Sequence, residues 1–158
     1  MSAIGFDTAS RTGWAYRDRS GLWRVGVCDP TRTLGLQAII GDAKRCGCTI
    51  AAVEDCYLGK NVRTLKKLQD AQTRIVLACE AHGLDVRLIP PQEWQADLGL
   101  TGDRDDRKFG AMRIAKILLG KQKIQLTQDM ADAVCIADYA ERIAAWASER
   151  CRRQSWVD

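Results

Sequence analysis

The feature that most constrains the fold is a short apolar run near the start of the sequence that ends in a carboxylate. Residues 3–7 (Ala-Ile-Gly-Phe-Asp) are followed by small polar residues and then by alternating Trp14 and Tyr16. This pattern predicts a buried strand, a tight turn and a second strand paired antiparallel to the first. Asp7 would lie where a core strand meets a cleft, although Asp is also common in turns because its side chain hydrogen-bonds its own backbone.

The following segments predict further strands separated by helices. Residues 22–28 and 84–88 alternate as strands, and the fully apolar residues 49–53 predict a central strand covered on both faces. A helix should open at Asp29 and Pro30, end at Gly47, and bury Leu34, Ile39, Ile40 and Ala43. Further helices are expected over residues 62–81, over 92–98 with Trp94 as a core anchor, over 107–119 after a polar loop at 99–106, and from a Thr127 cap to about residue 150.

The order of these elements predicts an α/β fold with a mixed five-stranded sheet flanked by helices. The first three strands form a meander, and a right-handed helical crossover places the fourth strand beside the first and parallel to it. Asp7 and Glu54 would then emerge side by side, at the edge where open α/β sheets bind ligands. A chain of 158 residues without a linker or repeat predicts one domain over residues 1–158.

A second pair of acids, Asp129 and Asp132, shares one face at the start of the last expected helix. The helix dipole favours acids at such positions, and Glu54 alone could mark a strand that reaches solvent. The apolar residues 131–137 indicate a buried helix, however, and buried acids need a counter-charge or a metal. Carboxylates without His or Cys suit Mg²⁺ or Mn²⁺, and two such ions about 3.5–4 Å apart can clamp a phosphodiester displacement.

The distribution of basic residues indicates a polyanionic partner. The net charge is +4. Lysines and arginines gather in three clusters, represented by Lys60, Arg63, Lys66, Lys67 and Arg74, by Arg104, Arg107, Lys108 and Arg113, and by Arg150, Arg152 and Arg153. One such cluster would suit an ordinary solvated helix face, but three in a small domain favour a nucleic acid.

The sequence predicts a soluble, cytoplasmic protein with reduced thiols. The first strand leaves no room for a signal peptide, and no apolar run reaches membrane-spanning length. Among seven cysteines only Cys46 and Cys48 are close together, and no partner follows at zinc-ligand spacing. The single histidine, His82, precedes Gly83 at an expected helix end, where we assign it no catalytic role.

Three motifs together resemble the RuvC-like Holliday junction resolvases of the ribonuclease H-like superfamily. They are Ile-Gly-Phe-Asp at residues 4–7, Ala-Val-Glu-Asp-Cys-Tyr-Leu-Gly-Lys-Asn at 52–61 and Asp-Met-Ala-Asp-Ala-Val at 129–134, and the resemblance spans nearly the whole chain. It implies a ribonuclease H-like fold and a structure-selective endonuclease that resolves four-way DNA junctions by paired symmetric nicks. It also implies two Mg²⁺ ions per active site, with Mn²⁺ as a substitute, and a homodimer built partly on the helix at 62–81.

The resemblance also assigns roles to individual residues. Asp7, Glu54, Asp129 and Asp132 match the metal-binding tetrad, and Lys108 matches a basic residue that acts at the scissile phosphate. Lys108 could otherwise simply contact a phosphate. Tyr57 matches an aromatic that stacks on bases at the junction centre, although a surface aromatic beside the cleft is an equal interpretation. The residues expected to bind DNA are Tyr57, Lys60, Asn61, Arg63, Lys66, Lys67, Arg104, Arg107 and Lys108.

The sequence departs from the family pattern in two places. Thr8 and Ala9 stand where bacterial members commonly have Pro-Gly, and residues 68–73 lack a glycine-containing stretch. These departures, with the Pro-Gln-Glu-Trp segment at 91–94, suit a phage or plasmid-type relative. Two other functions remain: a nuclease for RNA or RNA–DNA hybrids, which would depend on contacts to the 2′-hydroxyl, and a non-catalytic junction-binding module. The acids argue against the latter because they would repel phosphate unless a metal neutralised them.

Overall fold

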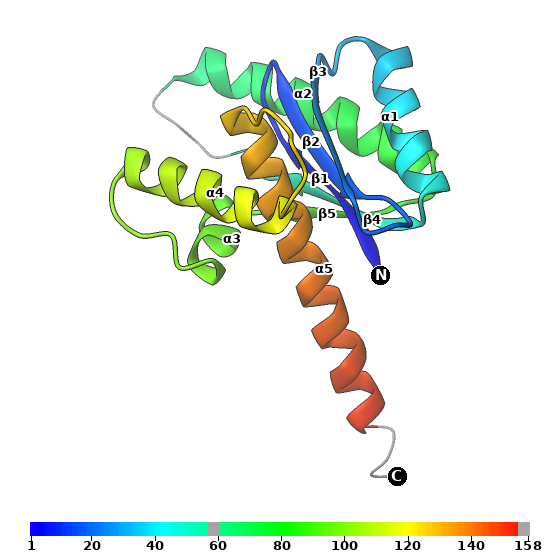
Figure 1. Ribbon diagram of the computed structural model, residues 1–158. Helices are drawn as coiled ribbons and strands as arrows, with labels where there is room; N and C mark the ends of the chain where they lie inside the picture. The colour runs from blue at the N-terminus through cyan, green and yellow to red at the C-terminus, as the bar shows by residue number, and fades with distance from the viewer. Residues whose placement is uncertain (57–60, 155–158) are drawn as a thin grey trace.

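Five strands form one mixed sheet in the order β3-β2-β1-β4-β5 (Figure 1). Strands β1 (Ser2–Asp7), β2 (Thr12–Arg17) and β3 (Trp23–Cys28) form an antiparallel meander, and β4 (Cys48–Glu54) and β5 (Asp85–Ile89) extend the sheet parallel to β1. The predicted five-stranded α/β sheet is confirmed, including the parallel pairing of β1 with β4.

Helices cover both faces of the sheet. The computed structural model describes residues 1–56 and 61–154, the last three by their backbone alone. Helices α1 (Thr33–Arg45) and α2 (Val62–Ala81) pack on one face, and α3 (Pro91–Asp97), α4 (Arg104–Leu119) and α5 (Gln128–Gln154) lie on the other (Figure 1). The carboxyl-terminal end of α5 extends past the sheet (Figure 1). None of the helices within the described ranges is long and apolar enough to cross a lipid bilayer.

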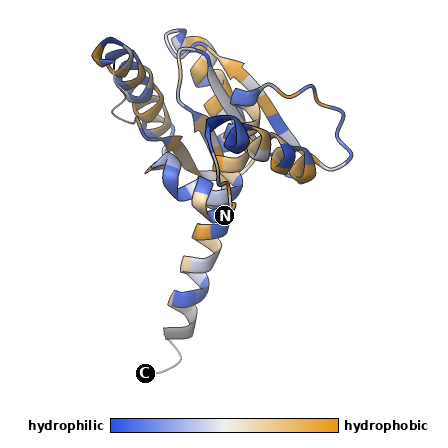
Figure 2. Ribbon diagram, turned by 90° about the vertical axis from the view of Figure 1, so that its left-hand side faces the viewer, coloured by the Kyte–Doolittle hydropathy of each residue, from blue (hydrophilic) through white to orange (hydrophobic). Residues whose placement is uncertain are grey.

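Strand alternation divides the core into two clusters. Ala3 faces the layer of α3, α4 and α5, whereas Ile4 and Phe6 face α1 and α2, and all three are fully buried. Figure 2 shows hydrophobic residues concentrated in the strands between the helices. Since successive side chains of a strand point to opposite faces, a central strand with both faces covered must be apolar throughout. This explains why β1 and β4 read as continuous apolar runs.

Two glycines let α5 approach the backbone of the sheet. A Cβ atom on Gly5 would lie 2.4 Å from the carbonyl oxygen of Ala133, and one on Gly13 would lie 2.0 Å from that of Asp129. Any side chain at either position would therefore push the helix away from the sheet. Glycines inside strands often mark such a close approach. Gly5 and Gly13 set the depth at which α5 lies, and with it the position of the acids in its first turns.

The predicted start of α1 is wrong. Residues 29–32 form a turn instead, in which the Asp29 carboxylate accepts hydrogen bonds from the amide and hydroxyl of Thr31 at 2.9 and 2.6 Å. The helix begins at Thr33, and its buried side comprises Leu36, Ile40 and Ala43. Leu34, predicted to be inside, is 84% exposed, because at about 100° per residue it lies on the opposite side of the helix from these buried residues.

The predicted loop before α4 extends too far. Residues 104–106 already belong to the helix, which is capped by Asp103. The Asp103 carboxylate accepts from the amide of Asp106 at 2.9 Å, and the Asp106 carboxylate accepts from the amide of Asp103 at 3.2 Å. This reciprocal arrangement is a capping box. The run of acids therefore opens a helix, which places Arg104 in its first turn.

Candidate active site

The first half of the site lies at two adjacent strand ends. Asp7 ends β1 and Glu54 ends β4, and the pairing of Phe6 with Val53 makes the two acids neighbours across the parallel ladder. The Thr8 hydroxyl donates a hydrogen bond to the carbonyl oxygen of Glu54 at 3.0 Å. Thr8, which departs from the family pattern, thus links the residue after β1 to the last residue of β4.

The second half lies in the first turns of α5. The Thr127 hydroxyl accepts from the amide of Met130 at 3.3 Å, as predicted for a cap. Asp129 and Asp132 follow, and the side-chain amide of Gln128 donates to the Asp132 carboxylate at 2.8 Å. Because α5 lies against β1 and β2, Asp129 comes close enough to raise the pKa of Asp7, and Asp7 in turn raises the pKa of Asp132.

Buried negative charge raises the pKa values of three of the acids. Burial, together with the charge of Glu54 and a hydrogen bond to it, raises the pKa of Asp7 from 3.8 to about 9. Burial and the charge of Asp7 raise the pKa of Asp132 to about 7. Burial also raises the pKa of Glu54, against hydrogen bonds from Asp7 and Trp94 that lower it. The site holds more carboxylates than its surroundings can stabilise as anions.

The residues of this acidic cluster fit a hard divalent cation. Among the described residues no three His, Cys, Asp or Glu side chains converge closely enough to hold a metal as they stand. Asp7 and Glu54 hydrogen-bond each other, and Asp132 is bonded to Gln128. The donor set is nonetheless oxygen-only, as Mg²⁺ and Mn²⁺ prefer, and a cation would stabilise the anionic forms that burial disfavours.

Basic side chains from α4 face the acids across a cavity of about 280 Å³. It is lined by Glu54, Trp94, Gln95, Arg104, Arg107, Lys108 and Asp132. Lys108 lowers the pKa values of Asp7 and Asp132, although burial outweighs it. None of the three basic residues forms an ion pair with a carboxylate in the part of the chain that the structure describes. Their charges are therefore available to a phosphate.

The other residues predicted to bind DNA are not all brought to this cavity. Arg63, Lys66 and Lys67 are exposed on α2, and the two lysines line a separate cavity of about 430 Å³ beside the turn at Ser10. The Asn61 side chain accepts from the amides of Arg63 and Thr64, so it acts as the amino-terminal cap of α2. Tyr57 and Lys60 lie outside the described residues.

Sequence reasoning missed several residues that build the site. Trp94 is buried as predicted, but its indole Nε1 also donates a hydrogen bond to Glu54 Oε1 at 3.1 Å. Gln128, Gly5 and Gly13 contact the carboxylates or the helix that bears two of them. Only the two glycines left a signal in the sequence, because a glycine within a strand pattern suggests close backbone approach.

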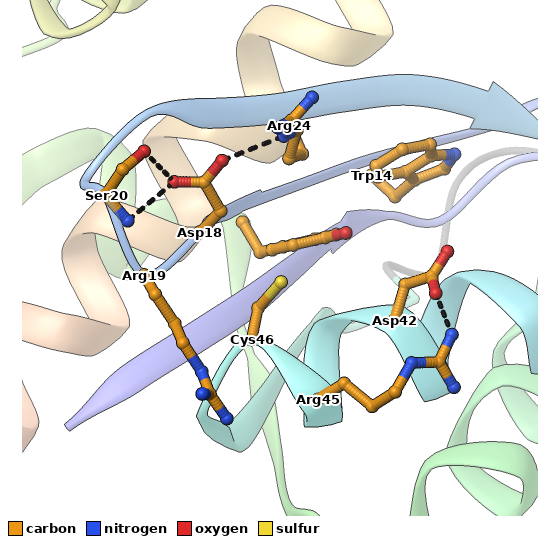
Figure 3. Close-up of a pocket in the computed structure, with 9 residues that line it drawn as sticks. Trp14, Asp18, Arg19, Ser20, Arg24, Asp42, Arg45 and Cys46 are labelled. Atoms are coloured by element: carbon orange, nitrogen blue, oxygen red, sulfur yellow. Dashed lines mark hydrogen bonds and ion pairs between the residues drawn. The ribbon is translucent and has the colours of Figure 1, made fainter.

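A larger cavity, of about 580 Å³, lies elsewhere, between the β2–β3 hairpin and the end of α1 (Figure 3). Asp18 pairs with Arg24 at 2.9 Å there, and Asp42 pairs with Arg45. These charges compensate one another, and the predicted site residues do not line this cavity. The acidic cluster is therefore the candidate active site.

Several proteins of known family are similar to this chain. Residues 35–138 match the family described as "Crossover junction endodeoxyribonuclease RuvC". The protein of that name from Nitratidesulfovibrio vulgaris (strain DP4) is 31% identical, over 85% of this chain and 89% of its own length. The one from Chloroflexus aggregans is 30% identical, over 87% and 90%. Both are bacterial, and a phage or plasmid origin for this chain stays a prediction.

Solved structures agree with the fold. The structure described as "T. thermophilus RuvC in complex with Holliday junction substrate" matches with a TM-score of 0.67 at 17% identity, over 87% of this chain and 90% of that one. A second Thermus thermophilus RuvC structure matches with a TM-score of 0.69 at 17% identity, over 91% and 97%. The sequence matches and the shared fold lead to one conclusion: this chain belongs to the crossover junction endodeoxyribonuclease RuvC family.

Proposed function

We propose that this protein resolves four-way DNA junctions by paired, symmetric nicks. The observation that carries the proposal is the acidic cluster at two strand ends and a helix start, faced across one cavity by Arg104, Arg107 and Lys108. A phosphodiester chain needs both signs of charge: cations to hold its phosphates and carboxylates to hold metal ions at the cleaved bond.

We assign the acids to metal binding and the bases to the DNA backbone. Asp7, Glu54, Asp129 and Asp132 would hold two Mg²⁺ ions, or Mn²⁺ in their place. When bound, such ions supply an activated water and neutralise the charge on the leaving oxygen. Lys108, next to the acids, would hold the scissile phosphate, while Arg104 and Arg107 hold phosphates beside it. Lys66 and Lys67 would extend the contact along an arm of the junction.

Symmetric nicking requires two active sites, so we propose that the chain, acting as one nuclease domain, works as a homodimer. Helix α2 supports this, because it leaves large apolar side chains on its outer side: Val62 is 67% exposed and Leu77 is 60% exposed. An interface along α2 would cover both side chains, which lie about four turns apart on the helix.

A substrate panel tests the function. The purified protein is incubated with a labelled four-way junction, the matching duplex and an RNA–DNA hybrid, each with Mg²⁺ or with EDTA. We expect cleavage of the junction alone, in Mg²⁺ alone, at paired positions on opposite strands. Faster cleavage of the hybrid would instead support the ribonuclease alternative, and binding without cleavage in Mg²⁺ or Mn²⁺ would support the non-catalytic module.

The raised pKa values predict that the metal-free protein loses stability as the pH rises. Asp7 and Asp132 keep protons in the folded state up to about pH 9 and about pH 7, whereas the unfolded chain releases them near the ordinary value of 3.8. The folded state therefore binds more protons in this window, and its free energy of unfolding falls with pH, by at most about 1.4 kcal/mol per pH unit for each group. Calorimetry in EDTA should show the Tm falling from about pH 6 to about pH 8.5.

Magnesium should reverse that loss. A bound cation replaces the protons on the carboxylates, so the rise in Tm caused by saturating Mg²⁺ should be larger at about pH 8.5 than at about pH 6. Asp7→Asn, which removes the most strongly shifted group, should flatten the pH dependence in EDTA. A Tm in EDTA that stays constant or rises over this range would contradict the assignment.

The lysines of α2 should make junction binding depend on salt. Each phosphate neutralised by a lysine adds about 0.9 to the slope of log affinity against log salt concentration. The double variant Lys66→Ala/Lys67→Ala should therefore lower the slope by up to about 2, with an unchanged metal requirement. Lys121→Ala/Lys123→Ala is a matched control, because these exposed lysines follow the carboxyl-terminal end of α4, whereas its amino-terminal end lines the acidic cavity. Equal slopes for both double variants would indicate that Lys66 and Lys67 do not contact the DNA backbone and lie on an ordinary solvated helix face.

A further inference from the structure

Trp94 contacts the acidic cluster from inside the protein. Its side chain is 2% exposed, and its only polar atom, the indole Nε1, donates to Glu54 Oε1 at 3.1 Å. A tryptophan N–H can only donate, so it holds a carboxylate oxygen and cannot compete for a cation. The same residue lines the cavity in which Arg107 and Lys108 face the acids. Trp94 therefore lies behind one of the proposed metal ligands rather than only within the core.

The short helix that carries Trp94 is fastened to the helix that carries the other acids. The Tyr139 hydroxyl of α5 donates to the Glu93 carboxylate of α3 at 3.3 Å. At the other end of α3, Arg142 of α5 pairs with Asp97 at 2.5 Å. These contacts lie on both sides of Trp94 in the sequence. They fix α3, and with it the indole that bonds to Glu54, relative to the helix that carries Asp129 and Asp132.

We propose that Trp94 is a positioning residue for metal binding, which fixes the Glu54 carboxylate in the orientation that the metal site requires. A glutamate has several rotatable bonds, and an unheld carboxylate would have to be ordered each time a cation bound. Hydrogen-bond partners behind metal ligands orient them, and losing such a partner typically costs about 10–100-fold in metal affinity. The inference rests on the proposed role of Glu54 as a metal ligand.

A matched pair of variants tests this role. Trp94→Phe keeps an aromatic ring but removes the donor to Glu54. Trp23→Phe makes the same change at a second tryptophan that is 2% exposed, whose Nε1 donates to the carbonyl oxygen of Leu118 at 3.1 Å. Mn²⁺ affinity of the full chain is measured without DNA, from the electron paramagnetic resonance signal of free Mn²⁺. We expect Trp94→Phe to weaken Mn²⁺ binding by about 10-fold and Trp23→Phe to leave it within about 2-fold of wild type.

The outcomes separate this inference from the proposed function. Weaker Mn²⁺ binding in Trp94→Phe alone supports the positioning role. Equal Mn²⁺ affinity in wild type and both variants overturns it while leaving the metal centre intact, and an equal loss in both variants overturns it in favour of a general packing effect. If wild type and Asp7→Asn bind Mn²⁺ equally weakly, the proposed metal centre itself fails, and the inference fails with it.

A second measurement needs no variant that could misfold. In the wild-type protein, the indole ¹H–¹⁵N signal of Trp94 should shift during a Mg²⁺ titration, because the charge on its acceptor changes as the cation binds. The indole signal of Trp23 should stay in place. A Trp94 signal that does not move while Mg²⁺ raises the Tm of the protein would overturn the contact with a metal ligand.

Discussion

Asp7→Asn is expected to abolish junction cleavage while junction binding survives or becomes tighter. Asp7 lies at the end of β1, beside Glu54, where burial raises its pKa to about 9. The carboxamide keeps the size of the side chain but removes the charge that a divalent cation needs. It also removes negative charge that would repel a phosphate, so the affinity for DNA should not fall. Cleavage and gel-shift assays on the same four-way junction measure the two effects.

A suitable control removes an aspartate charge elsewhere. Asp85 is exposed at the start of β5, and its one ion pair among the described residues is with Arg87, at 2.9 Å. The variant Asp85→Asn should therefore cleave at the wild-type rate. Cleavage by Asp7→Asn at more than about a tenth of the wild-type rate in saturating Mg²⁺ would contradict its role as a ligand, because even lost support behind a ligand costs about 10–100-fold.

The sheet and the acidic cluster could be predicted because they depend on patterns within short segments. The apolar residues 49–53 and the alternating hairpin at Trp14 and Tyr16 reveal strands by their periodicity. The handedness rule for crossovers then places β4 beside β1, and the parallel pairing brings Asp7 and Glu54 together. These steps use only chain order and side-chain period, which a sequence states directly.

The first residue of a helix is harder to predict from sequence, because an aspartate can either close a turn or cap a helix. Asp29 and Asp103 both precede helical segments. Asp29 bonds to Thr31 and closes a turn, whereas Asp103 caps α4 through Asp106. The local differences are the Pro-Thr pair that directly follows Asp29 and the Asp three residues after Asp103. The choice between them depends on how the chain packs, and in this chain it moves the start of α1 to Thr33.

The residues that support the site could not be predicted, because their partners are distant in sequence. Nothing near Trp94 indicates that its N–H reaches Glu54, 40 residues away. Asn61 is a second example: its side chain caps α2, a contact that the sequence analysis did not predict, and its role in binding DNA stays a prediction. Polar atoms are matched to partners only when the fold brings them together, so sequence reasoning identifies charges better than the contacts that orient them.

Gly13→Ala is expected to lower both stability and cleavage, because the added methyl group would occupy the space of the α5 backbone. The Cβ would lie 2.0 Å from the carbonyl oxygen of Asp129, a backbone atom that can move only if the helix moves. Overpacking of this kind costs about 1–3 kcal/mol, which corresponds to a Tm lower by about 2–12 °C for a chain of this size. Displacing Asp129 by about 1 Å should reduce cleavage by about 100-fold.

Gly35→Ala separates this effect from the general consequences of replacing a glycine. Gly35 lies in α1, and a Cβ there would meet no atom within 4 Å, so the substitution should raise stability by about 0.5–1 kcal/mol. Thermal unfolding and junction cleavage of both variants give the comparison. If Gly13→Ala unfolds and cleaves like the wild type, the close approach of α5 to β2 is not needed. If Gly13→Ala loses both stability and cleavage while Gly35→Ala loses neither, the position of Asp129 requires that residue 13 carry no side chain. Gly13 would then be needed to build the active site, although it has no functional group of its own.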